Sequence, residues 1–259
     1  MNSPRQTPLP PGILLIDKPT GWTSSDVVIK LRNRFRLEKV GHGGTLDPGA
    51  TGLLAILVGR QATRLSDPLM AGEKQYRATL QFGVQSDTLD LDGRVTLTGD
   101  WRRITREALE RLLPTFRGDI LQTPPMVSAI QIGGKRLYQL AREGLQIERQ
   151  PRPVHIRTLT LLAFHPPRAE LEIDCSKGTY IRTLCDDIGT ALGCGALVAD
   201  LRRTRIGPWR VEAAAPLREA LAWDRQTLLQ HLQPIPPELE ARRLSLKHPD
   251  TRATDPARP

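Results

Sequence analysis

A strictly alternating segment constrains the fold of this 259-residue chain more than any other feature of the sequence. Its apolar residues take every second position, the period of a β-strand with one buried face: Tyr76, Ala78, Leu80 and Phe82. Leu171–Cys175 alternates in the same way, and Ile13–Ile16 is a short apolar run followed by a turn-forming segment. The chain therefore needs a sheet that collects strands from distant parts of the sequence.

Single helices are expected between these strands. Val27, Leu31 and Phe35 recur every fourth residue, and Ser24 or Ser25 is placed to cap that helix. Further helices are expected after Thr105, from about Ile181 to Gly193, and over residues 217–232. This order predicts an α+β fold with one central, mixed but mainly antiparallel sheet, flanked by helices and loops.

Charge and cysteine content narrow the class of protein. The formal net charge of +9 fits a polyanionic partner, although ordinary solubility charge explains it equally well. The three cysteines form no CxxC pair and predict small buried thiols of a reducing compartment rather than disulfides or a metal site. With no membrane-length apolar run and no signal-peptide pattern, a soluble cytoplasmic protein is expected.

The ends of the chain and one internal stretch differ in composition from the rest. Residues 1–11 are proline-rich and are expected to be flexible, as is the polar tail over 233–259. Residues 122–152 mix prolines and glycines with cations, which is typical of a mobile insertion that grips RNA. The basic residues in this stretch are Lys135, Arg136, Arg142, Arg149 and Arg152.

Asp47 is the candidate for chemistry. It lies in a glycine-rich segment, and the proline that follows restricts it to extended backbone. A carboxylate in this setting could be a nucleophile, a general base or a metal ligand, whereas Asp-Pro is also a common turn pair. No second acidic residue stands at the spacing of a glycosidase pair, and no phosphate-binding or dinucleotide-binding motif is present.

The segment around Asp47, GHGGTLDPGATGLL, resembles the catalytic motif of the TruB family of pseudouridine synthases. Five more segments resemble motifs of that family, in the family's order: ILLIDKPTG (13–21), KQY (74–76), QTPPMVSAIQIGGKRLYQLAREG (122–144), CSKGTYIRTLCDDIG (175–189) and LRRTRIG (201–207). A chance match of separate motifs in one order is implausible. The chain is therefore identified as a member of this family, over about residues 12–216.

The resemblance implies the pseudouridine-synthase fold and a catalytic domain over 12–216. It implies that uridine 55 in the T-loop of tRNA is isomerised to pseudouridine without cofactor or metal, after the nucleotide flips out of the stack. Asp47 matches the family nucleophile. Tyr76 would stack on the uracil and help to remove the C5 proton, and Arg182 would pair with Asp47.

Other matched residues would serve the substrate. His42 would lie where the flipped nucleotide leaves the stack, Leu201 would form the apolar wall of the pocket, and Tyr180 would contact the substrate. Lys18, also on the substrate side, would support the catalytic loop. The insertion and a cluster of arginines would hold phosphates of the T-arm: Arg202, Arg203 and Arg205.

Some features depart from the family pattern. Val127 and Gln131 stand where the insertion usually has tyrosine and lysine. Fewer residues follow position 219 than a small domain needs, so no full RNA-binding module of the PUA type is expected there. A monomer is expected. Two alternatives stay open: a catalytically silent tRNA chaperone, and an RNA glycosidase or hydrolase that uses Asp47. A third, a general RNA-binding module, does not explain why Asp47, Tyr76 and Arg182 all fall on matched positions.

Overall fold

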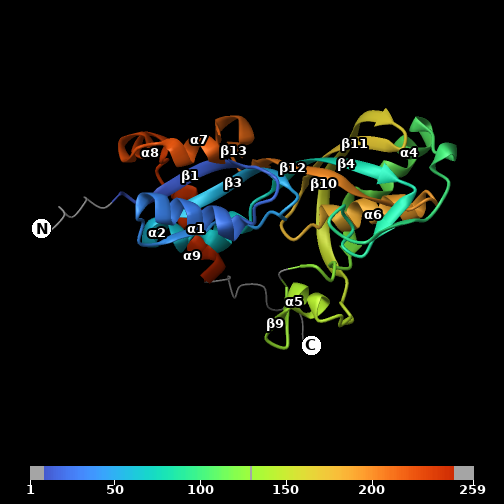
Figure 1. Cartoon of the computed structure of the whole chain (residues 1–259), viewed down its shortest axis with the longest axis horizontal. Coiled ribbons are helices and arrows are strands. Elements are labelled where there is room, and N and C mark those ends of the chain that lie inside the picture. The colour runs from blue at the N-terminus through green and yellow to red at the C-terminus, as the bar shows by residue number, and fades with distance from the viewer. Residues whose placement is uncertain (1–8, 129, 248–259) are drawn as a thin grey trace, which may run out of the picture. The chain divides into compact units, whose positions relative to one another are not determined.

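The computed structural model describes residues 9–128 and 130–247, and the chain forms two compact units (Figure 1). Unit 1 takes the chain up to Pro48, Gly52–Gly72 and the chain from Ile206 onward. Unit 2 takes Gly49–Thr51 and Glu73–Arg205. The segment 12–216 that carries the motifs therefore contributes to both units.

Unit 1 is built around β3 (Thr51–Val58), whose sequence TGLLAILV is buried except at its first residue. β1 (Gly12–Lys18) pairs with β3 in antiparallel orientation, and β14 (Ala215–Pro216) pairs with β1 in parallel orientation. β2 (Val40–His42) is antiparallel to β3. A strand that is apolar at nearly every position must be covered on both faces, and helices supply that cover.

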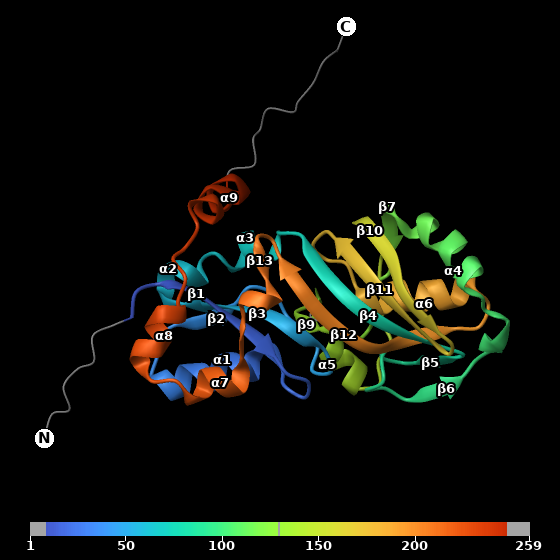
Figure 2. The same ribbon diagram turned by 90° about the horizontal axis from the view of Figure 1, so that it is seen from above.

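Each face of this sheet carries its own layer of helices (Figure 2). One core cluster joins Leu54 and Ile56 of β3 to α1 (Ser24–Phe35), α7 (Leu217–Ala222) and α8 (Arg225–His231). The alternate residues of β3 belong to a second cluster on the opposite face. Its helices are α2 (Gly59–Thr63), α3 (Ser66–Met70) and α9 (Pro237–Lys247), with β13 (Trp209–Arg210) beside them.

Five neighbouring sheet strands of unit 2 follow the order β12, β4, β11, β10, β7. The strand bounds are β4 (Lys74–Phe82), β7 (Gly118–Gln122), β10 (Arg152–His165), β11 (Arg168–Cys175) and β12 (Ala196–Ile206). β4, β11, β10 and β7 pair in antiparallel orientation, with Tyr76 opposite Ile173. The alternation of Tyr76–Phe82 is confirmed, because its apolar positions are the buried ones.

The remaining elements of unit 2 are short apart from α6 (Ile181–Ala191), which packs near β4. β5 (Val84–Ser86) and β6 (Val95–Leu97) form a hairpin, and α4 (Arg106–Leu112) precedes β7. The insertion holds β8 (Gln131–Ile132), β9 (Lys135–Arg136) and α5 (Leu137–Arg142). Three 3₁₀ turns complete the described elements: Trp101–Arg103, Leu113–Phe116 and Val211–Ala213.

The predicted α+β fold with a mixed, mainly antiparallel sheet is confirmed, whereas some local predictions are wrong. The N-cap of α1 is Thr23, not Ser24 or Ser25, because Thr23 and Asp26 form a reciprocal capping box. The glycine-rich stretch after position 40 also contains β2 and the start of β3.

The C-terminal region differs most from expectation. The helix expected over 217–232 is two helices, because Trp223 is extended and Asp224 caps α8 by accepting a hydrogen bond from Thr227 N. The tail expected to be disordered from 233 contains α9, whose Leu239 is buried in unit 1. Residues 248–259 of that tail, and most of the expected flexible lead-in, lie outside the described residues.

Candidate active site

The backbone just after Asp47 is anchored by a buried lysine. Lys18, at the end of β1, is fully buried, and its Nζ donates to the carbonyls of Pro19 at 3.0 Å, Trp22 at 2.7 Å and Pro48 at 3.2 Å. Pro48 O also accepts from Gly21 N at 2.9 Å. The carbonyl that follows Asp47 is thereby tied to the turn after β1.

The residue before Asp47 is anchored from α1. Ser24 Oγ donates to Leu46 O at 3.2 Å and accepts from Leu46 N at 2.8 Å. Gly43, also in this loop, packs against Leu69, and a Cβ at Gly43 would overlap the Leu69 side chain. Packing therefore accounts for this glycine, and close approach of a ligand is not needed to explain it. Asp47 itself is half-buried. Its two neighbours are therefore held by buried groups, which restricts where the carboxylate can lie.

Replacing Lys18 with methionine tests this anchoring. Methionine keeps most of the volume but gives the three carbonyls no donor, and each buried unsatisfied acceptor costs about 1–3 kcal/mol, partly offset because no charge is then buried. We expect a net loss of roughly 1–3 kcal/mol in the free energy of unfolding, measured by urea denaturation. Lys39→Met, at an exposed site of the same unit, is the control and should change little; equal stability of both variants would contradict the anchoring role.

Tyr76 lies on the buried face of β4. Its side chain is 8% exposed, and it shares that face with Ala78, Leu80 and Phe82. The antiparallel pairing with β11 fixes its register. A rigid strand therefore presents the ring in one orientation, as a stacking platform requires.

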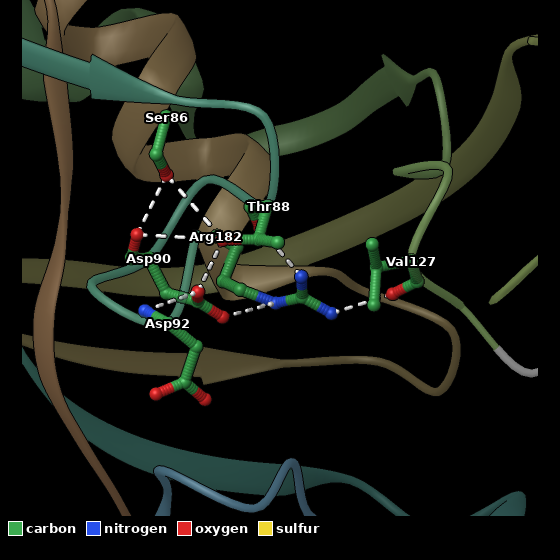
Figure 3. A network of polar contacts seen from close by, with 6 residues as sticks. All are labelled: Ser86, Thr88, Asp90, Asp92, Val127 and Arg182. Carbon is green, nitrogen blue, oxygen red and sulfur yellow. Dashed lines mark hydrogen bonds and ion pairs between the residues drawn. The ribbon is translucent and has the colours of Figure 1, made fainter. Parts of the chain in front are cut away.

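Arg182 lies in the first turn of α6 and is only 4% exposed (Figure 3). Its Nη1 donates to Thr88 O at 2.6 Å, its Nη2 donates to Val127 O at 2.8 Å, and its Nε lies 3.6 Å from Asp90 Oδ2. Arg182 is therefore not an ordinary surface charge. The buried guanidinium is held in a defined orientation by three groups from two segments, the loop after β5 and the insertion.

The loop between β5 and β6 is organised around this arginine (Figure 3). Asp90 Oδ1 accepts from Thr88 Oγ1 at 2.5 Å and from Asp92 N at 3.1 Å, and Ser86 Oγ donates to Asp90 O at 2.6 Å. Leu89 sits in the left-handed region with φ of 64°. These hydrogen bonds hold Asp90 in place independently of Arg182, so little side-chain entropy of Asp90 is lost when the ion pair forms.

Tyr180 directly precedes α6, and the buried amide of Gln122 binds its backbone. Tyr180 N donates to Gln122 Oε1 at 3.0 Å, and Gln122 Nε2 donates to Tyr180 O at 3.3 Å. The Tyr180 side chain is half-buried. The start of α6 is thus fastened to the end of β7.

The other matched residues occupy regular elements. His42 is half-buried at the end of β2, and Leu201 is 9% exposed on β12. His42, Asp47 and Lys18 belong to unit 1, whereas Tyr76, Tyr180, Arg182 and Leu201 belong to unit 2. The candidates form two groups, one in each unit.

Two of the arginines expected to hold phosphates are engaged within the protein. Arg203 is 1% exposed, which contradicts a role at the surface. Arg205 Nη2 donates to Asp174 Oδ2 at 2.6 Å, and Asp174 also pairs with Arg157. The exposed cations of the insertion remain as the candidates for phosphate contacts, among them Lys135, Arg136 and Arg142.

The cysteine thiols in the described part of the chain are poor alternatives to Asp47 as a nucleophile. The cysteines are buried as expected, and burial raises the pKa of the Cys175 thiol to about 12 and that of Cys185 further, so both are protonated and poorly nucleophilic near neutral pH. Over residues 9–128 and 130–247, no group of three or more His, Cys, Asp or Glu side chains is placed to hold a metal ion. No helix in these ranges has the length and apolar character needed to span a bilayer.

Sequence reasoning missed three residues that hold the start of α6 in place: Gln122, Asp90 and the carbonyl of Val127. Asp90 belongs to none of the matched segments, Gln122 is the first residue of the insertion, and Val127 stood out only as a departure from the family pattern. The one available signal was a glutamine at the end of a strand, but its burial depends on contacts with residues about 58 positions away.

Two family models cover most of the chain. The model described as "TruB family pseudouridylate synthase (N terminal domain)" matches residues 32–181, and "tRNA pseudouridylate synthase B C-terminal domain" matches residues 182–239. These matches define the class of protein as a pseudouridylate synthase. Within that class, the chain belongs to the TruB family.

Relatives agree with this placement. The tRNA pseudouridine synthase B of Stutzerimonas stutzeri is 50% identical over 206 residues, which are 80% of this chain and 67% of that protein. The protein of the same name from Heliobacterium mobile is 45% identical over 252 residues, 93% of this chain and 80% of that protein. The family resemblance found in the sequence is confirmed.

The fold is shared with a solved Cbf5-Nop10-Gar1 complex, whose matched chain is 28% identical with a TM-score of 0.69. The match covers 90% of this chain and 62% of that chain. A solved H/ACA RNP bound to a substrate RNA containing 2'-deoxyuridine matches with 26% identity and a TM-score of 0.67, over 90% of this chain and 61% of that chain. This chain thus spans about three fifths of the length of these solved chains.

Proposed function

We propose that this protein converts uridine 55 in the T-loop of tRNA to pseudouridine, with Asp47 as the nucleophile and without a cofactor. One observation carries the proposal: Asp47 lies in the family's catalytic motif, on a loop whose two flanking residues are held by the buried Ser24 and Lys18. Fixed flanking residues would hold the carboxylate in one position, as a nucleophile requires.

The reaction is an isomerisation. The N1–C1′ bond of the flipped uridine breaks, the uracil turns over, C5 bonds to C1′, and the proton on C5 is lost to solvent while N1 gains one. Asp47 acts on the sugar–base unit as the bond breaks. Tyr76 stacks on the uracil and assists removal of the C5 proton, and Arg182 orients the carboxylate of Asp47.

The substrate is held by contacts outside the reacting base. We propose that the basic insertion grips T-arm phosphates, which gives no sequence preference but fixes the register of the RNA. His42, Leu201 and Tyr180 then contact the flipped nucleotide, and Lys18 supports the loop. We propose that the protein acts in this way as a monomer in the cytoplasm.

Tritium release from a T-loop transcript labelled with 5-tritiated uridine tests the proposal. The full-length protein should release tritium to water in step with pseudouridine formation, because the C5 proton leaves only when C5 becomes the glycosidic carbon. Binding of the RNA without tritium release would favour the silent chaperone and contradict the proposal. Release of free uracil would instead indicate a glycosidase.

A further inference from the structure

The polar side chain of Gln122 is buried, so contact with solvent does not account for a glutamine at this position. It ends β7 at the root of the insertion and is only 2% exposed. Both polar atoms of its amide bond the backbone of the same residue: Oε1 accepts from Tyr180 N at 3.0 Å, and Nε2 donates to Tyr180 O at 3.3 Å. An amide that satisfies a donor and an acceptor of the same residue fixes the position of that residue.

Tyr180 is separated from Arg182 by a single residue, and both lie at the start of α6. The N–H groups at the start of a helix need acceptors from outside the helix. The N-cap residue Tyr180 makes no capping hydrogen bond with its own side chain, and Gln122 Oε1 accepts from the Tyr180 N–H. Any shift of Tyr180 moves the first turn and the Cα of Arg182 with it. The long guanidinium arm carries that movement to the charged end.

Residues 122–127, at the start of the insertion, make a second contact with the α6 start, because Val127 binds the Arg182 side chain. Val127 O accepts from Arg182 Nη2 at 2.8 Å (Figure 3), five residues beyond Gln122. Pro124 O, between these two points, accepts from Arg149 Nη1 at 3.0 Å, which closes the neck of the insertion. The segment 122–127 is thus bound at one end to the backbone before Arg182 and at the other to its side chain.

We propose that Gln122 is a positioning residue for the reaction: it sets the orientation of Arg182 by holding Tyr180, and it couples the root of the RNA-binding insertion to the catalytic arginine. The proposal rests on the proposed function, in which Arg182 orients Asp47. Gln122 touches no reacting atom, and its contribution passes through Arg182.

Gln122→Glu and Gln122→Leu separate positioning from general packing. The glutamate has the same shape but, when charged, cannot donate to Tyr180 O, and the leucine has neither polar atom. We expect each to slow the single-turnover rate of pseudouridine formation by about 10- to 100-fold, since small misplacements of a catalytic group have effects of this order. The Kd for T-arm RNA should stay within about twofold, because phosphate contacts set it.

The pH profile gives a readout that packing alone would not move. A protonated glutamic acid can both donate and accept, like the amide it replaces, and burial beside a carbonyl raises its pKa. The rate deficit of Gln122→Glu relative to wild type should therefore shrink as pH falls from about 8 to about 5.5, through the pKa of a buried carboxyl group. The deficit of Gln122→Leu should stay constant over that range. Gln61→Glu, at an exposed site of α2, controls for added charge.

A double-mutant cycle with Arg182→Lys then tests the route of the effect. If Gln122 acts through Arg182, replacing it in the Arg182→Lys background should cost little further rate, so the two effects will be strongly non-additive. Additive effects, a Gln122→Glu deficit that does not respond to pH, or a loss confined to RNA affinity would overturn the inference. If Gln122→Leu does not fold, Gln122→Glu at acid pH still gives the decisive comparison. Absence of tritium release by the wild type would contradict the proposed function instead, and so the two failures are distinguishable.

Discussion

Replacing Asp47 with asparagine is expected to lower pseudouridine formation by on the order of 10⁴-fold or more, the loss typical of removing a group that acts covalently. Asparagine has the same shape, but its amide is a poor nucleophile and carries no charge. The loop should persist, because Lys18 and Ser24 bind backbone atoms of Pro48 and Leu46 rather than the carboxylate of Asp47. Tritium release should be lost while RNA affinity is retained.

The control for Asp47→Asn is an exposed carboxylate of the same unit. Asp67 lies at the surface in α3, so Asp67→Asn should keep the wild-type rate. If Asp47→Asn released tritium as fast as wild type, Asp47 would not be the nucleophile. If Asp47→Asn lost tritium release but kept the cellular effect of the protein, that effect would not depend on catalysis, and the chaperone alternative would gain support.

Regular elements with a clear hydrophobic period were predicted from the sequence because their signal is local. Tyr76–Phe82 forms β4, and Val27, Leu31 and Phe35 form the buried stripe of α1. In both cases the spacing of the apolar residues, every second or every fourth position, indicates a strand or a helix without knowledge of the elements that pack against it. Propensity and tertiary packing agree there.

Elements that depend on a contact from elsewhere in the chain were not predicted. The pattern over 217–232 fits one helix, but Trp223 leaves the helix and stacks on His231 with ring centroids 4.1 Å apart. Arg34 of α1 donates to the carbonyls of Leu221 and Trp223, which satisfies the end of α7. The contact from Arg34 cannot be read from the segment itself, since Arg34 lies 187 to 189 residues away, whereas the aspartate that caps α8 is a local signal.

The candidate site shows the same division. The position of Asp47 in a glycine-rich loop before a proline was visible in the sequence. The groups that hold it were not, because Ser24 looked like a helix cap and is instead bound to Leu46 once Thr23 takes the cap. The burial of Arg182 was not visible in the sequence either, because it is produced by the loop after β5 and by the insertion, neither of which shows a local pattern of burial.

The second large effect is expected for Arg182→Lys, which keeps the charge but loses the shape of the guanidinium. Three nitrogens of Arg182 point in fixed directions, toward Asp90, Thr88 O and Val127 O. A lysine ammonium is a compact charge on a flexible chain and cannot meet all of these groups at once. In the proposed function Arg182 orients the carboxylate of Asp47, so we expect Arg182→Lys to lower the rate by about 10²- to 10³-fold, the range seen when one preorganised electrostatic group is removed.

The exposed Arg117 provides a control for this substitution. It lies in the same unit, and its Nε and Nη2 both donate to Leu159 O, at 3.2 and 2.7 Å, so Arg117→Lys also removes a bidentate arginine contact. Thermal unfolding should shift modestly for both variants, whereas single-turnover rates should fall only for Arg182→Lys. A wild-type rate for Arg182→Lys, measured below its unfolding temperature, would show that Arg182 serves the fold alone. A rate loss confined to Arg182→Lys would instead link Arg182 to the chemistry, because both variants exchange an arginine for a lysine in the same unit and differ in which site they disturb.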